Sequence, residues 1–405
     1  MIKPQTLKGF RDFLPNEARK RQYAIDILQG VFESYGFEPL ETPAIEYEEI
    51  LLGKYGEEGD KLMYRFTDRG GRKVTLRYDQ TVPLARVVAQ YGSAGSPQGQ
   101  NDLPMPFKRY QIQNVWRAEN TQKGRFREFM QCDIDTVGTT SPIADAENII
   151  IAQKSLEKLG FKKFKIRVGD RKLFEGIPQS AIIIIDKLKK IGEEKVIEEL
   201  KAKGLDEKVL DKIKNSKPSE NIELILGIAQ EMGVAENVHF DPALARGLNY
   251  YTGMILEVEI DGFDAGSVAG GGRYDNLIGI FAGKQIPAVG FAFGFDRLIE
   301  AMTELKLFPD DLQTTKVLVT VFSKELKEQA LSCSLSLRSN GVPTELYLDE
   351  NAKMEKQLKY ADKKGIPYAI IIGPNEARNN TVTVKNLKKR TQQTINKEKL
   401  KDVLQ

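Results

Sequence analysis

The spacing of apolar residues changes along the chain and separates regions of different secondary structure. Near the N-terminus, apolar residues recur at helical spacing in a stretch that Asn16 is suited to cap and Gly36 to end. This stripe consists of Ala24, Leu28, Val31 and Tyr35. From there to about Gly138, short strand-like runs alternate with polar turns, which predicts an antiparallel sheet with one solvated or ligand-facing side.

A helical stretch interrupts this strand pattern at about residues 174–235. It is rich in Lys, Glu, Leu and Ile, with Gly192 and Gly204 as breaks. Strand-like alternation returns at residues 254–260. We therefore interpret the helical stretch as an insertion within one α+β domain, residues 1–310, built on a mostly antiparallel sheet flanked by helices.

The last part of the chain, after a linker at residues 308–311, alternates differently. Strand-like runs at residues 316–322, 344–348 and 368–372 are separated by two helical stripes. Alternating strands and helices predict a small α/β domain with a largely parallel sheet, at residues 316–405.

Composition is that of a globular protein of about two or three domains. Of the 405 residues, 41% are hydrophobic and 29% are charged, so there is enough apolar surface to bury. The sequence contains no apolar stretch of the length that a signal peptide or a membrane span needs. We therefore expect a cytoplasmic protein with no membrane partner.

The net charge of +3 is unevenly distributed. Residues 316–405 hold 17 basic and 10 acidic residues, a surplus of 7, which leaves −4 for the residues before them. A basic domain appended to an acidic body is typical of a module that binds a phosphate backbone. A solvated, lysine-rich surface would carry the same charge.

Cysteine and histidine are scarce, which narrows the chemistry. Only Cys132, Cys333 and His239 are present, so a disulfide framework and a Cys/His zinc site are nearly excluded. A mechanism with a histidine base would have to use His239, which has no nucleophile motif beside it. We interpret His239 as structural, and we expect no metal site made of side chains.

The most informative stretch, residues 115–135, is predicted to form two antiparallel strands joined by a polar loop. Because side chains alternate along a strand, Arg117 and Glu119 share one face. On the returning strand, the shared face holds Phe129, Gln131, Asp133 and Asp135. An arginine can bind a phosphate, an aromatic ring can stack on a base, and an amide with carboxylates can hold an ammonium or an imidazole. An ordinary exposed hairpin has a similar composition, so the pattern alone leaves both readings open.

This hairpin resembles the second signature motif of class II aminoacyl-tRNA synthetases. Residues 289–298 resemble the third motif, and residues 36–43 the first, which in the family builds the dimer interface. Residues 76–83 resemble the amino-acid-binding loop of the histidine-specific members, and residues 246–253 and 269–275 resemble their two specific motifs. The resemblance covers essentially the whole chain, in the right order.

The resemblance implies the class II fold, with residues 1–310 as the catalytic domain and residues 316–405 as an anticodon-binding α/β domain. It implies a homodimer that activates L-histidine with ATP to histidyl-adenylate and pyrophosphate. Histidine is then transferred to the 3′ end of tRNA(His). Magnesium bound through the ATP phosphates is the implied cofactor.

The site residues that follow from the resemblance fall into four groups. Histidine-binding residues are expected to be Asp79, Gln80, Thr81, Gln131, Asp135, Tyr250 and Tyr251. ATP-binding residues are expected to be Arg117, Glu119, Arg125, Phe129 and Arg297. Gln122 and Lys123 are expected to contact the acceptor end of tRNA. Arg246, with Arg117, is the expected catalytic residue, as a fixed cation that stabilises the charge growing on the α-phosphate.

The chain departs from the family pattern in a few places. Asn249 stands where an aspartate is common, and Gln80 is unusual in its loop. Asp79 and Asp135 are shorter than the glutamates of many bacterial members, which indicates the aspartate variant of the pocket.

Two alternatives come from related proteins. Synthetase-like proteins that serve as histidine-sensing subunits of a biosynthetic transferase typically lack the C-terminal module and key catalytic positions. This chain keeps Arg246, Arg117 and Arg297, together with the basic residues 316–405. A class II synthetase for glycine or proline is disfavoured by the two histidine-type motifs.

Overall fold

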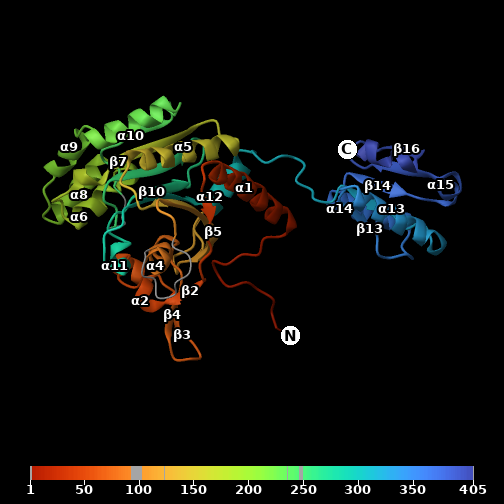
Figure 1. Ribbon diagram of the computed structural model, residues 1–405, viewed down its shortest axis with the longest axis horizontal. Coiled ribbons are helices and arrows are strands. Elements are labelled where there is room, and N and C mark those ends of the chain that lie inside the picture. The colour runs from red at the N-terminus through yellow and green to blue at the C-terminus, as the bar shows by residue number, and fades with distance from the viewer. Residues whose placement is uncertain (1, 93–102, 123, 235, 246–249, 405) are drawn as a thin grey trace. The chain divides into compact units, whose positions relative to one another are not determined.

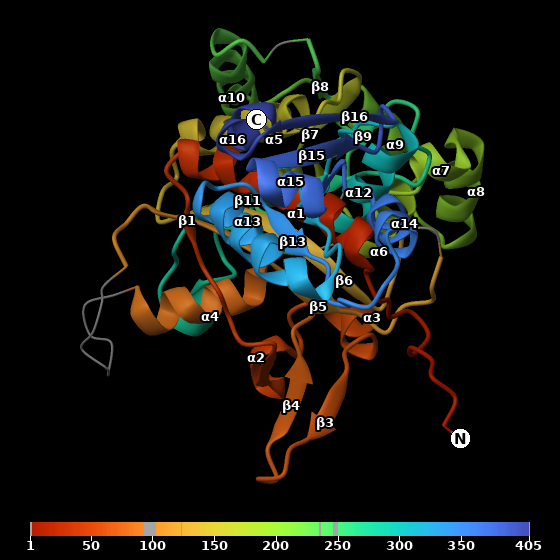
Figure 2. The ribbon, with the colours of Figure 1, turned by 90° about the vertical axis from the view of Figure 1, so that its right-hand side faces the viewer.

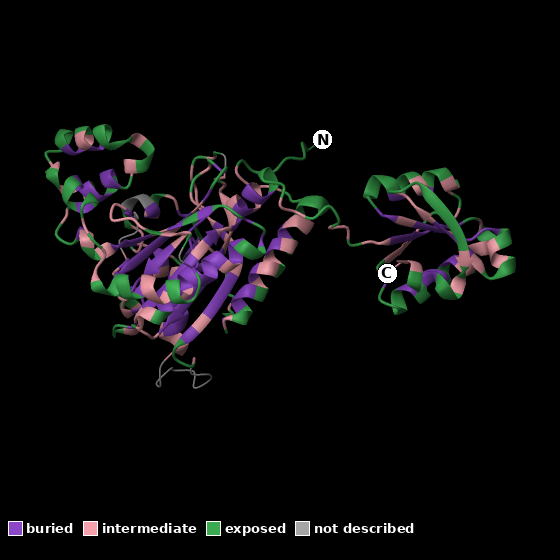
Figure 3. Ribbon diagram, turned by 90° about the horizontal axis from the view of Figure 1, so that it is seen from above, coloured by how far each residue is buried: buried purple, intermediate pink, exposed green. Residues whose placement is uncertain are grey.

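A computed structural model describes residues 2–92, 103–122, 124–234, 236–245 and 250–404. The chain divides into two compact units, Met1–Phe308 and Pro309–Gln405. The central strands of the largest sheet in each unit are mostly buried (Figure 3). Across the described part of the chain, no helix combines the length and the apolar content needed to span a bilayer.

The first unit is built on an eight-stranded sheet in the order β1-β5-β6-β11-β10-β9-β7-β8. The strands are β1 (Glu38–Pro39), β5 (Phe107–Trp116), β6 (Glu128–Val137), β11 (Ala288–Gly294), β10 (Ala269–Arg273), β9 (Met254–Ile260), β7 (Phe164–Asp170) and β8 (Val238–Phe240). Only the edge pairs β1–β5 and β7–β8 are parallel. The predicted mostly antiparallel sheet is therefore confirmed.

Helices cover one face of this sheet and close the main core. They are α1 (Pro15–Ser34), α5 (Pro142–Lys158), α10 (Glu220–Glu231) and α12 (Phe295–Glu304). Leu28, Ile149 and Leu298 pack there against Cys132 and Ile134 of β6. Figure 1 shows α1, α5 and α10 on the same side of the sheet. The opposite face is left for polar side chains at its centre.

The start of α1 differs from the sequence-based expectation. Its N-cap is Leu14, its first residue is Pro15, and no side chain caps it, so Asn16 lies inside the helix. Proline fits the first helical position because its fixed φ suits the helix and its missing N–H would have had no partner there. The stripe itself is confirmed, since Ala24, Leu28 and Val31 are buried.

The helical stretch between β7 and β8 has two parts. A 3-10 turn (Arg171–Phe174) leads into α6 (Gln179–Ile185), α7 (Leu188–Ile191), α8 (Glu193–Ala202) and α9 (Lys208–Lys214). These helices share a small core of their own, which includes Ile185, Val196 and Leu210. By contrast, α10 contributes Ile222 and Ile225 to the main core beside α5.

A smaller sheet and several short helices lie between β1 and β5. The three strands, in the order β2-β4-β3, are β2 (Ile45–Tyr47), β4 (Lys73–Leu76) and β3 (Arg65–Thr67). The helices are α2 (Glu48–Leu51), α3 (Gly56–Lys61) and α4 (Thr81–Tyr91). Figure 2 shows β3 and β4 projecting from the body. Helix α4 packs with α11 (Gly279–Ala282) in a second core, which contains Tyr78, Tyr251 and Tyr274.

The second unit holds a five-stranded sheet in the order β13-β12-β14-β15-β16. Its strands are β12 (Val317–Val319), β13 (Thr344–Leu346), β14 (Tyr368–Ile371), β15 (Thr381–Asn386) and β16 (Thr391–Asn396). Its helices are α13 (Lys327–Ser339), α14 (Met354–Lys364), α15 (Pro374–Asn379) and α16 (Leu400–Leu404), with 3-10 turns at Lys324–Leu326 and Lys397–Lys399. β12 is parallel to β13 and β14, as predicted, and an antiparallel pair, β15 and β16, extends the sheet.

Candidate active site

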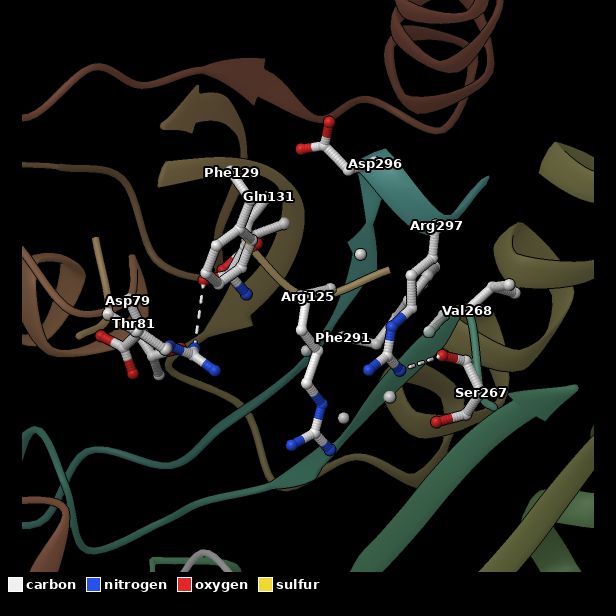
Figure 4. A pocket seen from close by; sticks show the side chains of 18 of the residues that line it. Asp79, Thr81, Arg125, Phe129, Gln131, Ser267, Val268, Phe291, Asp296 and Arg297 are labelled. Atoms are coloured by element: carbon white, nitrogen blue, oxygen red, sulfur yellow. Dashed lines mark hydrogen bonds between the residues drawn. The ribbon is translucent and has the colours of Figure 1, made fainter. Parts of the chain in front are cut away.

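A cavity of about 350 Å³ lies over the polar face of the main sheet (Figure 4). Its walls come from β6, β10 and β11, from the loop between β5 and β6, from the start of α4 and from the start of α12. Eleven residues expected from the sequence line it: Asp79, Thr81, Arg117, Glu119, Arg125, Phe129, Gln131, Asp135, Tyr250, Tyr251 and Arg297. Residues far apart in the sequence thus meet in one space.

Strand β6 supplies the back of the cavity by strict alternation. Phe129, Gln131 and Asp135 line the cavity, while Cys132 and Ile134 are fully buried in the core on the other face. Two-residue periodicity is the reason, because neighbouring side chains of a strand point to opposite sides. The predicted facing of this hairpin is confirmed.

Two glycines let the strands of the cavity wall approach each other. Gly290 of β11 lies opposite Asp135 of β6, and an added Cβ would lie 2.0 Å from Asp135 Oδ1. At Gly271 of β10, an added Cβ would lie 2.1 Å from the carbonyl oxygen of Gly290. Neither position has room for a side chain. Gly290 leaves its volume to the carboxylate of Asp135, and Gly271 lets β10 lie close to the backbone of β11.

We predict that Gly290→Ala displaces Asp135 and lowers the unfolding free energy by about 1–3 kcal/mol. Gly227→Ala is the control, because Gly227 lies within helix α10 with open space around its Cβ position. Alanine there should be neutral or slightly stabilising. Chemical denaturation checks both variants. If Gly290→Ala were as stable as the unmodified protein, the assigned packing would be wrong.

Buried carboxylates define one end of the cavity. Asp79 accepts hydrogen bonds from the Tyr55 hydroxyl (2.7 Å) and from the Val82 amide (3.1 Å). Asp135 forms an ion pair with Arg109 (2.6 Å) and accepts a hydrogen bond from the Tyr274 hydroxyl. Burial raises the pKa of Asp79. It raises the pKa of Asp135 to about 6, against the opposing effect of Arg109.

Three residues at this end were given no role from the sequence. Asp133 lines the cavity, and its Oδ1 is buried with no hydrogen-bond partner among the described residues. Burial raises the pKa of Asp133 well above its usual range. The alternation along β6 had placed Asp133 on this face. Arg109 and Tyr274 could not be assigned in this way, because their partner Asp135 lies on another strand.

Arg117 lies between the two ends of the cavity. Its Nε donates to the carbonyl of Tyr78 (3.1 Å), and its Nη2 lies 3.5 Å from Oε1 of Gln131. Its guanidinium carbon is 4.4 Å from the ring centroid of Tyr78 and 5.1 Å from that of Phe129. These contacts fix the cation while leaving it on the cavity wall, beside an aromatic ring on which a base can stack.

The other end of the cavity is cationic. Figure 4 shows Arg125 and Arg297 extending side by side into it, away from Asp79 and Thr81. Arg297 donates to the carbonyls of Gly124 (3.2 Å) and Ser267 (2.9 Å). Burial lowers the pKa of Arg297, and the positive charge of Arg125 lowers it further. Two guanidinium groups that repel each other favour a polyanion between them.

Two expected site residues do not line the described cavity, and two others lie outside the described residues. Gln80 is fully buried, and its amide nitrogen donates to the carbonyls of Gln113 (2.8 Å) and Gln131 (3.2 Å), so we withdraw its expected contact with histidine. Gln122 forms an isolated bridge with Arg125 and is not part of the lining. Arg246 and Lys123 lie outside the described residues.

Neither a histidine nor a metal cluster takes part in the described site. His239 lies on β8 and does not line the cavity. Within residues that the structure describes, no group of three or more His, Cys, Asp or Glu side chains is arranged to hold a metal ion.

Comparison with known proteins gives a consistent result over the whole chain. The family model for histidyl-tRNA synthetase matches residues 9–216 and 187–298, and the anticodon binding domain model matches residues 316–405. A histidine–tRNA ligase of Cytophaga hutchinsonii is 39% identical, with 96% of each chain covered. One of Aeropyrum pernix is 42% identical, covering 94% of this chain and 93% of the relative.

A solved structure agrees with these relatives. The crystal structure of histidyl-tRNA synthetase from Nostoc has a TM-score of 0.84 and 32% sequence identity, and the match covers 100% of this chain and 99% of that chain. The predicted class II fold is confirmed by this likeness. Because family models match most of the chain and relatives well above 30% identity cover nearly all of it, the protein belongs to the histidyl-tRNA synthetase family.

Proposed function

We infer that the protein is a histidine–tRNA ligase, which activates L-histidine with ATP and transfers it to tRNA(His). The observation that carries this inference is one cavity with two chemically different ends. Buried carboxylates lie at one end, and Arg125 and Arg297 lie at the other, with Arg117 between them. Such a cavity suits an amino acid and a triphosphate bound side by side.

At the carboxylate end, we propose that Asp79, Thr81 and Gln131 hold the α-amino group of histidine. The buried carboxylate of Asp79 supports this role, because an ammonium group would pair with it. Asp135 and Tyr251 are proposed to bind the imidazole, with Tyr250 beside them. The carboxylate of Asp135 is held in place by Arg109, as a specific ligand for a ring N–H requires.

At the cationic end, we propose that Phe129 stacks on the adenine, while Arg117 contacts the α-phosphate. Arg125 and Arg297 would hold the outer phosphates. Magnesium is proposed to bind mainly through those phosphates and to neutralise part of their charge. The carboxylate of Glu119, which lines the cavity 3.7 Å from Arg125, fits a cation at this end.

The proposed reaction has two steps. A carboxylate oxygen of histidine attacks the α-phosphorus, a P–O bond forms, and pyrophosphate leaves. No protein base is needed, because the nucleophile is already ionised. Arg117, together with Arg246, would stabilise the charge that grows on the α-phosphate. A ribose hydroxyl at the 3′ end of tRNA then attacks the carbonyl carbon, and AMP leaves.

The remaining partners and the domain limits are also proposals. Residues 1–310 would form the catalytic domain, with the helical insertion at about 174–235. Residues 316–405 would bind the anticodon of tRNA(His), supported by their basic surplus and by the family model that matches them. Gln122 and Lys123 would contact the acceptor end. We propose a cytoplasmic homodimer.

The direct test is amino-acid-dependent exchange of pyrophosphate into ATP. We expect exchange with histidine and none above background with the other amino acids, because the carboxylate of Asp135 beside the ring of Tyr251 suits an imidazole side chain. A signal with glycine or proline instead would reassign the substrate. Absence of exchange, combined with binding of histidine, would favour the regulatory-subunit alternative.

A further inference from the structure

The N-terminal segment lies against the loop between β5 and β6. The carbonyl of Gly9 accepts hydrogen bonds from the amides of Arg127 (2.9 Å) and Glu128 (3.4 Å). Gly9 has a φ of +88°, and an added Cβ would lie 2.7 Å from Cγ of Arg127. A side chain there would therefore be strained and crowded. Glycine lets the two backbones run close together, which brings Arg11 to the side of the cavity.

Arg11 contacts two separate elements of the nucleotide end. Its guanidinium carbon lies 3.2 Å from the ring centroid of Phe126, in the loop, and its Nη2 lies 2.6 Å from Oδ1 of Asp296, at the start of α12. Its Nε is buried and has no hydrogen-bond partner in the described part of the chain, which suits a guanidinium packed on a ring. Both Phe126 and Asp296 line the cavity.

The two elements that Arg11 joins carry the cations of the phosphate end. Arg125 directly precedes Phe126 in the loop, and Arg297 directly follows Asp296 in the helix. Arg125 is half-exposed, and its charge opposes that of Arg297. A contact that holds loop and helix together would oppose this repulsion before the nucleotide binds.

We propose that Arg11 is a positioning residue for ATP, which acts through Phe126 and Asp296 to hold Arg125 and Arg297 at the spacing that a triphosphate requires. The proposal deepens the function inferred above, since it takes ATP as the ligand of the cationic end. Arg11 itself does not line the cavity.

A need to neutralise the charge of Asp296 does not by itself explain why Arg11 lies at this position. Asp296 already has a second partner in Arg21, also at 2.6 Å, and it accepts a hydrogen bond from the amide of Met130 (2.9 Å). Arg21 packs on Phe13 (3.9 Å to the ring centroid) and Phe295 (5.0 Å). Among the described residues, Arg11 is the cation that lies over the ring of Phe126.

The test compares Arg11→Ala, Arg11→Lys and Phe126→Leu in the full-length protein. Lysine keeps the charge beside Asp296 but lacks the planar group that lies on the ring. We expect each variant to raise the KM for ATP by roughly tenfold, with the KM for histidine changed by less than about twofold. Combining Arg11→Ala with Phe126→Leu should add little to either single effect, because both break the same contact.

Arg72→Ala is the matched control. Arg72 also pairs with an aspartate, Asp68 (2.6 Å), but on an exposed turn that is not part of the cavity lining. The KM of the Arg72→Ala variant for ATP should not change. Recovery of normal ATP affinity in Arg11→Lys, an equal rise in both KM values, or fully additive effects in the double variant would each overturn the proposal.

Thermal unfolding of every variant distinguishes loss of the fold from misplacement of Arg125 and Arg297 in a folded protein. Should Arg11→Ala fail to fold, the folded Arg11→Lys and Phe126→Leu variants still carry the comparison. Calorimetric titration with ATP alone measures nucleotide binding without histidine. Unchanged ATP affinity in the Arg11 variants would refute the role of Arg11. Absence of histidine-dependent exchange in the unmodified protein would instead refute the proposed reaction.

Discussion

Arg117→Ala is expected to lower the rate of histidine-dependent pyrophosphate exchange by about 10²- to 10³-fold, the usual effect of removing one group that stabilises transition-state charge. Arg117 is fixed by the carbonyl of Tyr78 and by the rings of Tyr78 and Phe129, so its guanidinium needs little reorganisation when negative charge develops on the α-phosphate. Alanine would remove both the charge and this fixed geometry.

The measurement is single-turnover adenylate formation at saturating ATP and histidine, which isolates the chemical step from binding. Arg125→Ala serves as the comparison, because the half-exposed Arg125 is expected to act mainly on ATP affinity and less on the rate. If Arg117→Ala changed only the KM for ATP and left the single-turnover rate intact, Arg117 would be an anchor for ground-state ATP.

Asp135→Asn is expected to weaken histidine binding strongly, because the amide lacks the negative charge that pairs with an imidazole N–H. Arg109 is fully buried and forms its ion pair with Asp135, so the substitution also leaves a buried cation without its counter-charge. Because burial raises the pKa of Asp135, removing its charge relieves a desolvation cost that offsets this loss, and urea denaturation should show only a small change in stability. Calorimetry with histidine measures the loss of affinity.

The pH dependence gives a second view of Asp135. Burial raises its pKa from 3.8 to about 6, so the carboxyl is protonated below about pH 6. Because the folded-state pKa is the higher one, ionising this group costs stability, and the cost appears as pH rises from 3.8 to about 6. An imidazole N–H requires the ionised carboxylate, so histidine affinity should fall below about pH 6.

Free histidine also titrates in this range, and the control must remove that effect. Triazolylalanine, whose ring stays neutral at these pH values, should show the same loss of affinity below about pH 6 in the unmodified protein. A folded Asp135→Asn variant should not show it. A flat profile with triazolylalanine would contradict the assignment of Asp135 to the imidazole.

Sequence reasoning succeeded where chemistry followed a local period. The alternation along β6 placed Phe129, Gln131 and Asp135 on one face, and the structure confirms that they share a cavity. Neighbours along one strand have fixed relative directions, so these positions needed no knowledge of the rest of the fold. The resemblance to known motifs then supplied the partners of this strand from distant segments.

The misses arose where a side chain's partner lies elsewhere in the fold. Gln80 precedes α4, a helix that is buried on nearly all sides, so no apolar stripe distinguished this helix from the strands around it. The side-chain amide nitrogen of Gln80 donates to two backbone carbonyls, those of Gln113 and Gln131. Arg109, on β5, and Tyr274, directly after β10, converge on Asp135 of β6. Arg11, near the N-terminus, meets Asp296 across 285 positions of sequence. The periodicity of one segment does not predict side-chain contacts between residues on different segments.

The separate core of α6–α9 has a consequence for local unfolding. Because Ile185, Val196 and Leu210 pack mainly with one another, these four helices can open as a cooperative unit while α10 and the strands stay closed. Amide hydrogen exchange should therefore be faster in residues 179–214 than in α10, although the two are adjacent in sequence. Proteases should cut first in this region, leaving the sheet that forms the cavity intact.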